Sequence, residues 1–263
     1  MATSNTATAA APADGHVHAA VADGIATVRF GHPKGNSLPA GVLRELARTV
    51  TELGRADDVR VIVLRSDGTG PFCAGASFTE LASIDDAARG KEFFMGFARL
   101  ILAMRSAPKF ILARVHGRAV GGGVGIVAAS DYAFAHRGAA VKLSELAVGI
   151  GPFVVGPVIE RKIGLGGLQA LAVDATGFRD ATWAEQRGLY SRLFETVPEL
   201  DAALDALAAR LAASNPEAMA RMKSMFWEGT EHWDALLEER AETSGTLVLS
   251  DFTRNAIASF GGR

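Results

Sequence analysis

Apolar residues along the chain follow two spacings, one typical of strands and one typical of helices. The segment HVHAAVADGIATVRF is rich in apolar and β-branched residues, and Asp23-Gly24 interrupts it with a turn signature. We therefore predict an opening β-hairpin. A helix follows, capped by Ser37 and with Pro39 in its first turn. Its buried face is predicted by apolar residues at helical spacing, namely Val42, Leu43, Leu46, Val50 and Leu53.

Short apolar runs alternate with helical patterns in the next hundred residues. VRVIVLRS (59–66) and KFILARVHG (109–117) are typical of buried strands. Between them, a long helix ends before Pro108. Its apolar residues are Phe93, Phe94, Phe97, Leu100, Ile101 and Met104. A glycine-rich segment, 121–129, leads into another helix, and YAFAH and AVKL predict further short strands. The recurrence of strand, loop and helix indicates an α/β fold.

Beyond Pro152 the pattern becomes mainly helical. We expect helices over residues 153–163 and after Gly164. A further helix is expected to start at Thr182, with Glu185 completing a capping box, and three or four more should follow.

This pattern predicts three parts of the chain. Residues 1–15, rich in Ala, Thr and Ser, are expected to form a disordered tail. Residues 16–195 are expected to form the α/β core and residues 196–263 a helical C-terminal lobe. The start of the chain lacks the basic and apolar regions of a secretion signal, and we expect no membrane span.

Composition excludes several classes of protein. A net charge of −2 and a pI near 6.3 give no global basic field, so we expect no nucleic-acid partner. Cys73 is the only cysteine, which rules out an intrachain disulfide and a cysteine-based metal cluster. We therefore predict no metal site and a cytoplasmic location.

The loop Gly70–Ser77 is the first candidate for chemistry. It consists mainly of small residues after a buried strand, so its backbone N–H groups can approach a ligand. A short glycine loop taken alone is more often a plain surface turn. The thiol of Cys73 has apolar neighbours, which favours a buried, inert cysteine over a nucleophile.

The second candidate is the segment Ala119–Gly125, where a strand passes into a helix. Free N–H groups and the positive end of the helix favour an anion or an oxyanion there. A competing hypothesis takes Gly123, Gly125 and Ala128 as a dinucleotide fingerprint, with Glu145 as the distant acid. It is the weaker one, because a strand intervenes too early before Glu145.

Glu145 is the best candidate for proton transfer. It follows the predicted AVKL strand and precedes an apolar run. An apolar pocket would raise its pKa above the usual value of about 4.3. The alternative is a structural carboxylate that pairs with Lys142 or Arg114. His116 and His136 are also titratable, but each lies near an arginine at a strand end, where histidines are more often structural.

Three segments in this order and spacing carry a resemblance: FCAGASFTEL, VHGRAVGGGVGIVAASDYAFA and SELAVGIGPFVVGPVIERKIG. Together they resemble the enoyl-CoA hydratase/isomerase (crotonase) superfamily. The resemblance implies a crotonase-like spiral of ββα turns with a C-terminal helical trimerisation lobe. It also implies homotrimers, which often pair into hexamers.

The resemblance also implies an activity on acyl-CoA thioesters. By motif position, the backbone N–H groups of Ala76 and Gly122 would hold the thioester oxygen of an enolate-like intermediate, which is catalysis of the oxyanion-hole kind. Coenzyme A belongs to the substrate, so no separate cofactor is expected. The expected substrate-binding residues are Lys34, as a phosphate partner, Asn36, Cys73, Ala74 and Gly121.

Departures from the family pattern refine this expectation. Hydratases typically carry two glutamates that position a water molecule. Glu145 matches the second, but Gly125 stands at the position of the first. Ser77 replaces a common aspartate, and AIASFGGR replaces the usual basic C-terminus. One carboxylate can move a proton between carbons, whereas hydration normally needs two, so we favour double-bond isomerisation. The alternatives are an enoyl-CoA hydratase, an acyl-CoA hydrolase or decarboxylase, and a non-catalytic CoA- or RNA-binding relative.

Overall fold

The structure is a computed structural model that describes residues 14–261, so most of the predicted N-terminal tail lies outside the described residues. The strands are β1 (His16–Ala22), β2 (Ile25–Gly31), β3 (Val61–Ser66), β4 (Phe110–Val115), β5 (Ala119–Val120), β6 (Tyr132–His136), β7 (Ala140–Lys142), β8 (Arg179–Asp180) and β9 (Arg192–Phe194). The helices are α1 (Ala40–Arg55), α2 (Phe78–Leu81), α3 (Ala87–Ser106), α4 (Gly122–Ala129), the 3-10 helix η1 (Leu146–Val148), α5 (Gly156–Ala172), α6 (Ala181–Gln186), α7 (Val197–Ala212), α8 (Pro216–Phe226), α9 (Trp233–Leu247) and α10 (Asp251–Gly261).

The strands form two sheets in a mixed α/β fold, as predicted. The larger sheet has the order β1-β2-β3-β4-β6-β9, and the smaller one has the order β5-β7-β8. In the larger sheet only the β1–β2 pair is antiparallel. Asp23 and Gly24 both have positive φ, at 52° and 76°, as the predicted two-residue hairpin turn requires.

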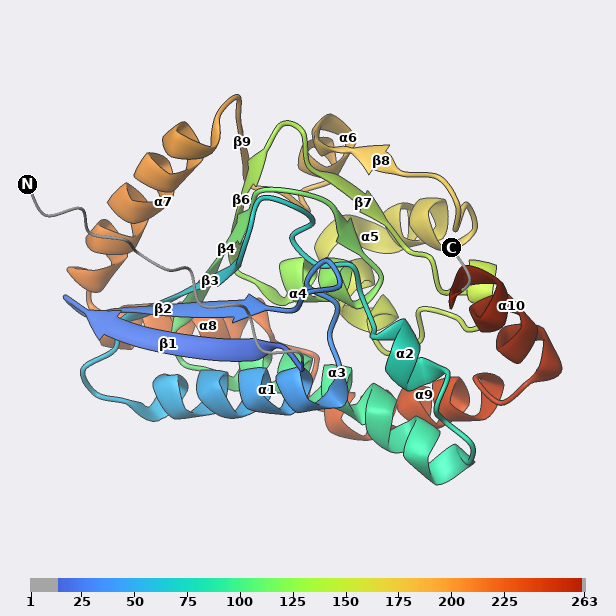
Figure 1. The fold of residues 1–263 in the computed structure, drawn as a ribbon. Coiled ribbons are helices and arrows are strands. Elements are labelled where there is room, and N and C mark those ends of the chain that lie inside the picture. The colour runs from blue at the N-terminus through green and yellow to red at the C-terminus, as the bar shows by residue number, and fades with distance from the viewer. Residues whose placement is uncertain (1–13, 262–263) are drawn as a thin grey trace, which may run out of the picture.

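Helices cover both faces of the larger sheet (Figure 1). On one face, α1 and α3 bury the main apolar cluster, which contains all five predicted core residues of α1 and continues into α4 and α5. On the other face, Leu200, Leu204 and Ala208 of α7 and Met219 of α8 pack on Val61, Val63 and neighbouring strand residues. Within residues 14–261 no helix is both long enough and apolar enough to cross a bilayer.

Helix α9 packs along α3, although the two are far apart in the sequence. Two glycines permit this contact. A Cβ on Gly90 would lie 2.6 Å from the carbonyl oxygen of Gly245, and a Cβ on Gly245 would strike the backbone of Lys91. The two backbones therefore touch directly. Helix α10 continues from α9 and contacts η1 and α2 (Figure 1).

Three predicted helix starts are wrong. Helix α1 begins at Ala40, and Ser37 does not cap it because its hydroxyl bonds the His32 ring; Ala40 N–H instead donates to Glu80, 2.7 Å away. Helix α6 has Asp180 as its N-cap, two residues before Thr182, where the predicted capping box begins.

The helix expected over residues 153–163 begins only at Gly156 and continues, across a non-helical Gly164, to Ala172. A capping box does occur, but at Thr196 and Glu199 of α7.

Candidate active site

The loop before α2 presents the amide of Ala76. Leu38 N–H donates to Gly75 O at 2.8 Å, and Ser77 N–H donates to Leu38 O at 3.3 Å. These bonds direct the groups on either side of Ala76 toward Leu38, so the Ala76 N–H points the opposite way. No acceptor within residues 14–261 bonds to it. Ser77 also caps α2 by accepting a hydrogen bond from Glu80 N–H.

The turn from β5 into α4 presents a second amide. Gly121 has φ 53° and ψ −120°, a conformation that side chains disfavour, and it accepts hydrogen bonds from Val124 N–H and Gly125 N–H. Gly122 is the first helical residue, so its N–H has no partner in the preceding turn. In the part of the chain that the structure describes, this amide has no acceptor.

Close backbone contacts bring these two segments and Glu145 together. A Cβ on Gly75 would lie 2.9 Å from the carbonyl oxygen of Val120, so the two loops touch. A Cβ on Gly121 would lie 2.9 Å from Glu145 Oε1. The carboxyl group of Glu145 therefore occupies the space that Gly121 leaves open, next to the free amide of Gly122.

Glu145 has the electrostatics of a proton-transfer group. Its Oε2 is buried and has no hydrogen-bond partner among the described residues. Burial is the largest influence, and it raises the pKa of Glu145 to about 7. The expected structural alternative fails, because Arg114 pairs with Asp201 at 2.5 Å and the Lys142 ammonium lies over the Phe178 ring.

These groups line one small cavity of about 60 Å³. Of the predicted site residues, those that line it are Ala74, Ala76, Gly121, Gly122 and Glu145. The other lining residues are largely apolar and come from α2, α3 and the 148–155 segment; they include Phe78, Leu81, Phe94, Phe97, Val148, Ile150, Phe153, Val154 and Val155.

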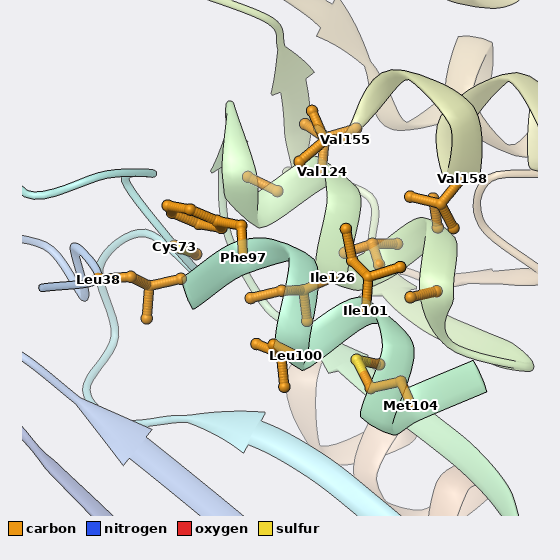
Figure 2. Packing of buried hydrophobic residues seen from close by; sticks show 14 of the residues in the cluster. Leu38, Cys73, Phe97, Leu100, Ile101, Met104, Val124, Ile126, Val155 and Val158 are labelled. Atoms are coloured by element: carbon orange, nitrogen blue, oxygen red, sulfur yellow. The ribbon is translucent and has the colours of Figure 1, made fainter. Parts of the chain in front are cut away.

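Two apolar side chains leave no room for a side chain at Gly122 or Gly125 of α4. A Cβ on Gly122 would overlap the ring of Phe97, which packs directly against it. A Cβ on Gly125 would lie 2.6 Å from Cγ1 of Val155. Figure 2 shows both side chains close to α4. The space beside Gly125 is therefore filled by a valine.

The other predicted substrate-binding residues do not line this cavity. Asn36 is buried, and its side chain bonds to His32 N–H, Asp67 O and Pro71 O. Cys73 is fully buried, and burial raises the pKa of its thiol to about 12, as expected for an inert cysteine. Lys34 is exposed and donates to Thr79 Oγ1 at 2.7 Å, in a neighbouring hollow.

Neither histidine lies in the cavity. His116 is buried, and its two ring nitrogens have no partner among the described residues. His136 Nε2 lies 3.0 Å from the carbonyl oxygen of Glu195. Both are therefore parts of the scaffold, as expected for histidines near strand ends.

Sequence reasoning missed part of the cavity wall. Phe97 was predicted as a core residue, and it is one, but it also faces the cavity. Ser244 of α9 lines the cavity from almost a hundred residues beyond Glu145. No motif surrounds Ser244 in the sequence, so only the packing of α9 on α3 reveals it.

The fold and the site define an α/β protein in which two unpaired backbone amides and a buried glutamate face an apolar cavity. A family model described as enoyl-CoA hydratase/isomerase matches residues 20–254. The chain therefore belongs to the enoyl-CoA hydratase/isomerase family, which is a family of enzymes. This confirms the resemblance and the crotonase-like fold.

Individual relatives carry different activities in their names. A (7aS)-7a-methyl-1,5-dioxo-2,3,5,6,7,7a-hexahydro-1H-indene-carboxyl-CoA hydrolase from Rhodococcus jostii is 28% identical over 87% of this chain and 86% of its own length. A probable enoyl-CoA hydratase from Bacillus subtilis is 25% identical over 90% of this chain and 92% of its own. A peroxisomal Delta(3,5)-Delta(2,4)-dienoyl-CoA isomerase from Arabidopsis thaliana is 25% identical over 85% of this chain and 84% of its own.

Solved structures share the whole fold. The crystal structure of a putative enoyl-CoA hydratase from Mycobacterium avium paratuberculosis has a TM-score of 0.83 and 26% identity, covering 94% of this chain and 96% of that one. The enoyl-CoA hydratase from Bacillus halodurans has a TM-score of 0.85 at 21% identity, covering 92% of this chain and 99% of that one.

Proposed function

We propose that this protein isomerises the double bond of an enoyl-CoA thioester. The amides of Ala76 and Gly122 hold the thioester oxygen as negative charge develops on it, which is the usual role of an oxyanion hole. Glu145 takes a proton from C2 and returns it to C4, acting first as base and then as acid. The atoms balance without a co-reactant, so the mass of the substrate is unchanged.

One observation carries this proposal: the unpaired, buried carboxyl oxygen of Glu145 beside the free amide of Gly122. A pKa of about 7 suits a group that both accepts and donates a proton near neutral pH. Among the described residues, Glu145 is the cavity's single carboxylate. Hydration would require a second group to activate water, and Val155 fills the space beside Gly125.

The coenzyme A portion is proposed to leave the cavity past Ala74 toward the exposed ammonium group of Lys34, which would contact a phosphate. The backbone of Cys73 is less available to bind coenzyme A than expected. Its N–H donates to Arg118 O, and its C=O accepts a hydrogen bond from Val120 N–H. The homotrimer and the cytoplasmic location also remain proposals.

The test is a panel of acyl-CoA substrates followed by mass spectrometry, with Glu145→Gln as the inactive control. Isomerisation converts a 3-enoyl-CoA to its 2-enoyl isomer at constant mass, hydration adds one water, and hydrolysis releases free coenzyme A. If the protein hydrates a 2-enoyl-CoA as fast as it isomerises the 3-enoyl form, the isomerase proposal is wrong.

A further inference from the structure

Ser244 is a buried hydroxyl that the proposed chemistry does not use. It is 1% exposed and lines the cavity from α9. Its hydroxyl makes no hydrogen bond within residues 14–261, and its neighbours on the wall are largely apolar. This hydroxyl is not among the fully enclosed unpaired polar atoms, so it borders the cavity space, where water or a ligand can bond to it. A ligand oxygen placed there would give it a direct partner.

The close contact of α9 with α3 is what places Ser244 at the cavity. Gly245, the next residue, touches the backbone of Gly90 and Lys91. Any larger residue at this crossing would push α9 outward. The two glycines therefore let a polar group from α9 reach a wall that is otherwise built from apolar side chains of α2 and α3.

Two contacts on helix α3 show from which end Ser244 reaches the cavity. Phe97 packs against Gly122, at the amide proposed to hold the thioester oxygen, whereas the α9 contact beside Ser244 lies at Gly90. Seven residues, or roughly 10 Å of helix axis, separate these two positions of α3. Ser244 therefore lines the cavity from the end of α3 that is turned away from the Gly122 amide.

We propose that Ser244 is a specificity-determining residue that hydrogen-bonds an oxygen atom on the distal part of the acyl group. The substrate class is then a CoA thioester whose acyl group carries a hydroxyl or keto oxygen several bonds beyond the thioester. This inference rests on the proposed action on acyl-CoA thioesters and narrows it.

The experiment compares 3-enoyl-CoA substrates of equal length, one with a plain hydrocarbon tail and others with a hydroxyl or keto oxygen moved one carbon at a time along the distal half. Wild type, Ser244→Ala and Thr246→Ala are assayed for kcat and KM. Thr246 is the matched control, because it loses a hydroxyl from the exposed side of the same helix. Circular dichroism and melting temperature verify that all three are folded.

We expect wild type to prefer one oxygenated substrate by roughly 10-fold in kcat/KM, mainly through a lower KM. Ser244→Ala should lose this preference and keep its rate on the plain substrate, while Thr246→Ala keeps both. Equal rates for wild type on all tails, or an undiminished preference in Ser244→Ala, would overturn the inference. A loss of rate on the plain tail in Ser244→Ala would also overturn it, because the residue would then act in the chemistry. No turnover of any thioester by wild type would instead refute the proposed function.

Discussion

Replacing Glu145 with Gln removes the proposed base while keeping the size of the side chain. Burial raises the pKa of Glu145 from 4.5 to about 7. A shift of this size corresponds to about 3 kcal/mol, at about 1.4 kcal/mol per pKa unit. A general base typically contributes about 100- to 10,000-fold to the rate. We expect kcat of Glu145→Gln to fall within this range, while the affinity for an acyl-CoA changes little.

The assay is the isomerisation rate of a 3-enoyl-CoA across the pH range around neutrality. Glu145 must be ionised to accept a proton, so kcat/KM of the wild type should rise as the pH approaches 7 and level off above it. The variant should show a low rate without this inflection. A variant that retains more than about a tenth of the wild-type rate, or the same inflection, would refute the assignment of Glu145 as the base.

The same substitution predicts a change in stability. The folded state raises the pKa of Glu145 above its unfolded value, so folding favours the protonated form. The wild type should therefore lose stability relative to Glu145→Gln as the pH rises from about 4.5 to about 7, by up to about 3 kcal/mol. Urea denaturation of both proteins on either side of this range measures the difference. An unchanged difference would show that the carboxyl group is well solvated.

Two further predictions concern packing at the site, and a third concerns a buried ion pair outside it. Gly122→Ala should lower the melting temperature and the rate together, because the new methyl overlaps Phe97, and overpacking typically costs about 1–3 kcal/mol. Gly125→Glu alone should not enable hydration of a 2-enoyl-CoA, since Val155 fills the space that the new side chain would need. The double variant with Val155→Gly tests whether lack of space prevents hydration. Hydration by the single variant would contradict this explanation. Lys223→Met should destabilise the protein by about 3–5 kcal/mol in urea denaturation, because it removes the cation that pairs with the buried Asp131 carboxylate 2.6 Å away and leaves that charge only the N–H of Ile111. A loss below about 1 kcal/mol would contradict this.

Patterns of neighbouring residues correctly predicted those elements that neighbouring residues determine. The hairpin at Asp23-Gly24 and the apolar face of α1 follow from turn chemistry and spacing, and the structure confirms both. The predicted cap at Ser37 fails because Glu80, forty residues away, takes over the first amide of α1. A local pattern cannot anticipate such a competing partner.

In the candidate site, too, some residues could be predicted from local sequence and others could not. Glycine loops and a carboxylate after a strand were visible in the sequence, because backbone geometry demands those residue types. The direction of Phe97 and the arrival of Ser244 were not visible, since both depend on how α3 packs against α4 and α9. The side chain of Asn36 is held within its own loop for a similar reason: three nearby backbone groups bond to it.

The glycine contact between α3 and α9 has a consequence for the order of synthesis. Glu145 leaves the ribosome about a hundred residues before Ser244, which corresponds to roughly 5–20 s of translation, and both amide loops leave earlier still. During that interval, the nascent chain already contains the groups proposed to carry the chemistry, but the cavity wall that α9 supplies does not yet exist. The part of the enzyme proposed to choose among substrates is thus made after the part proposed to carry out the reaction.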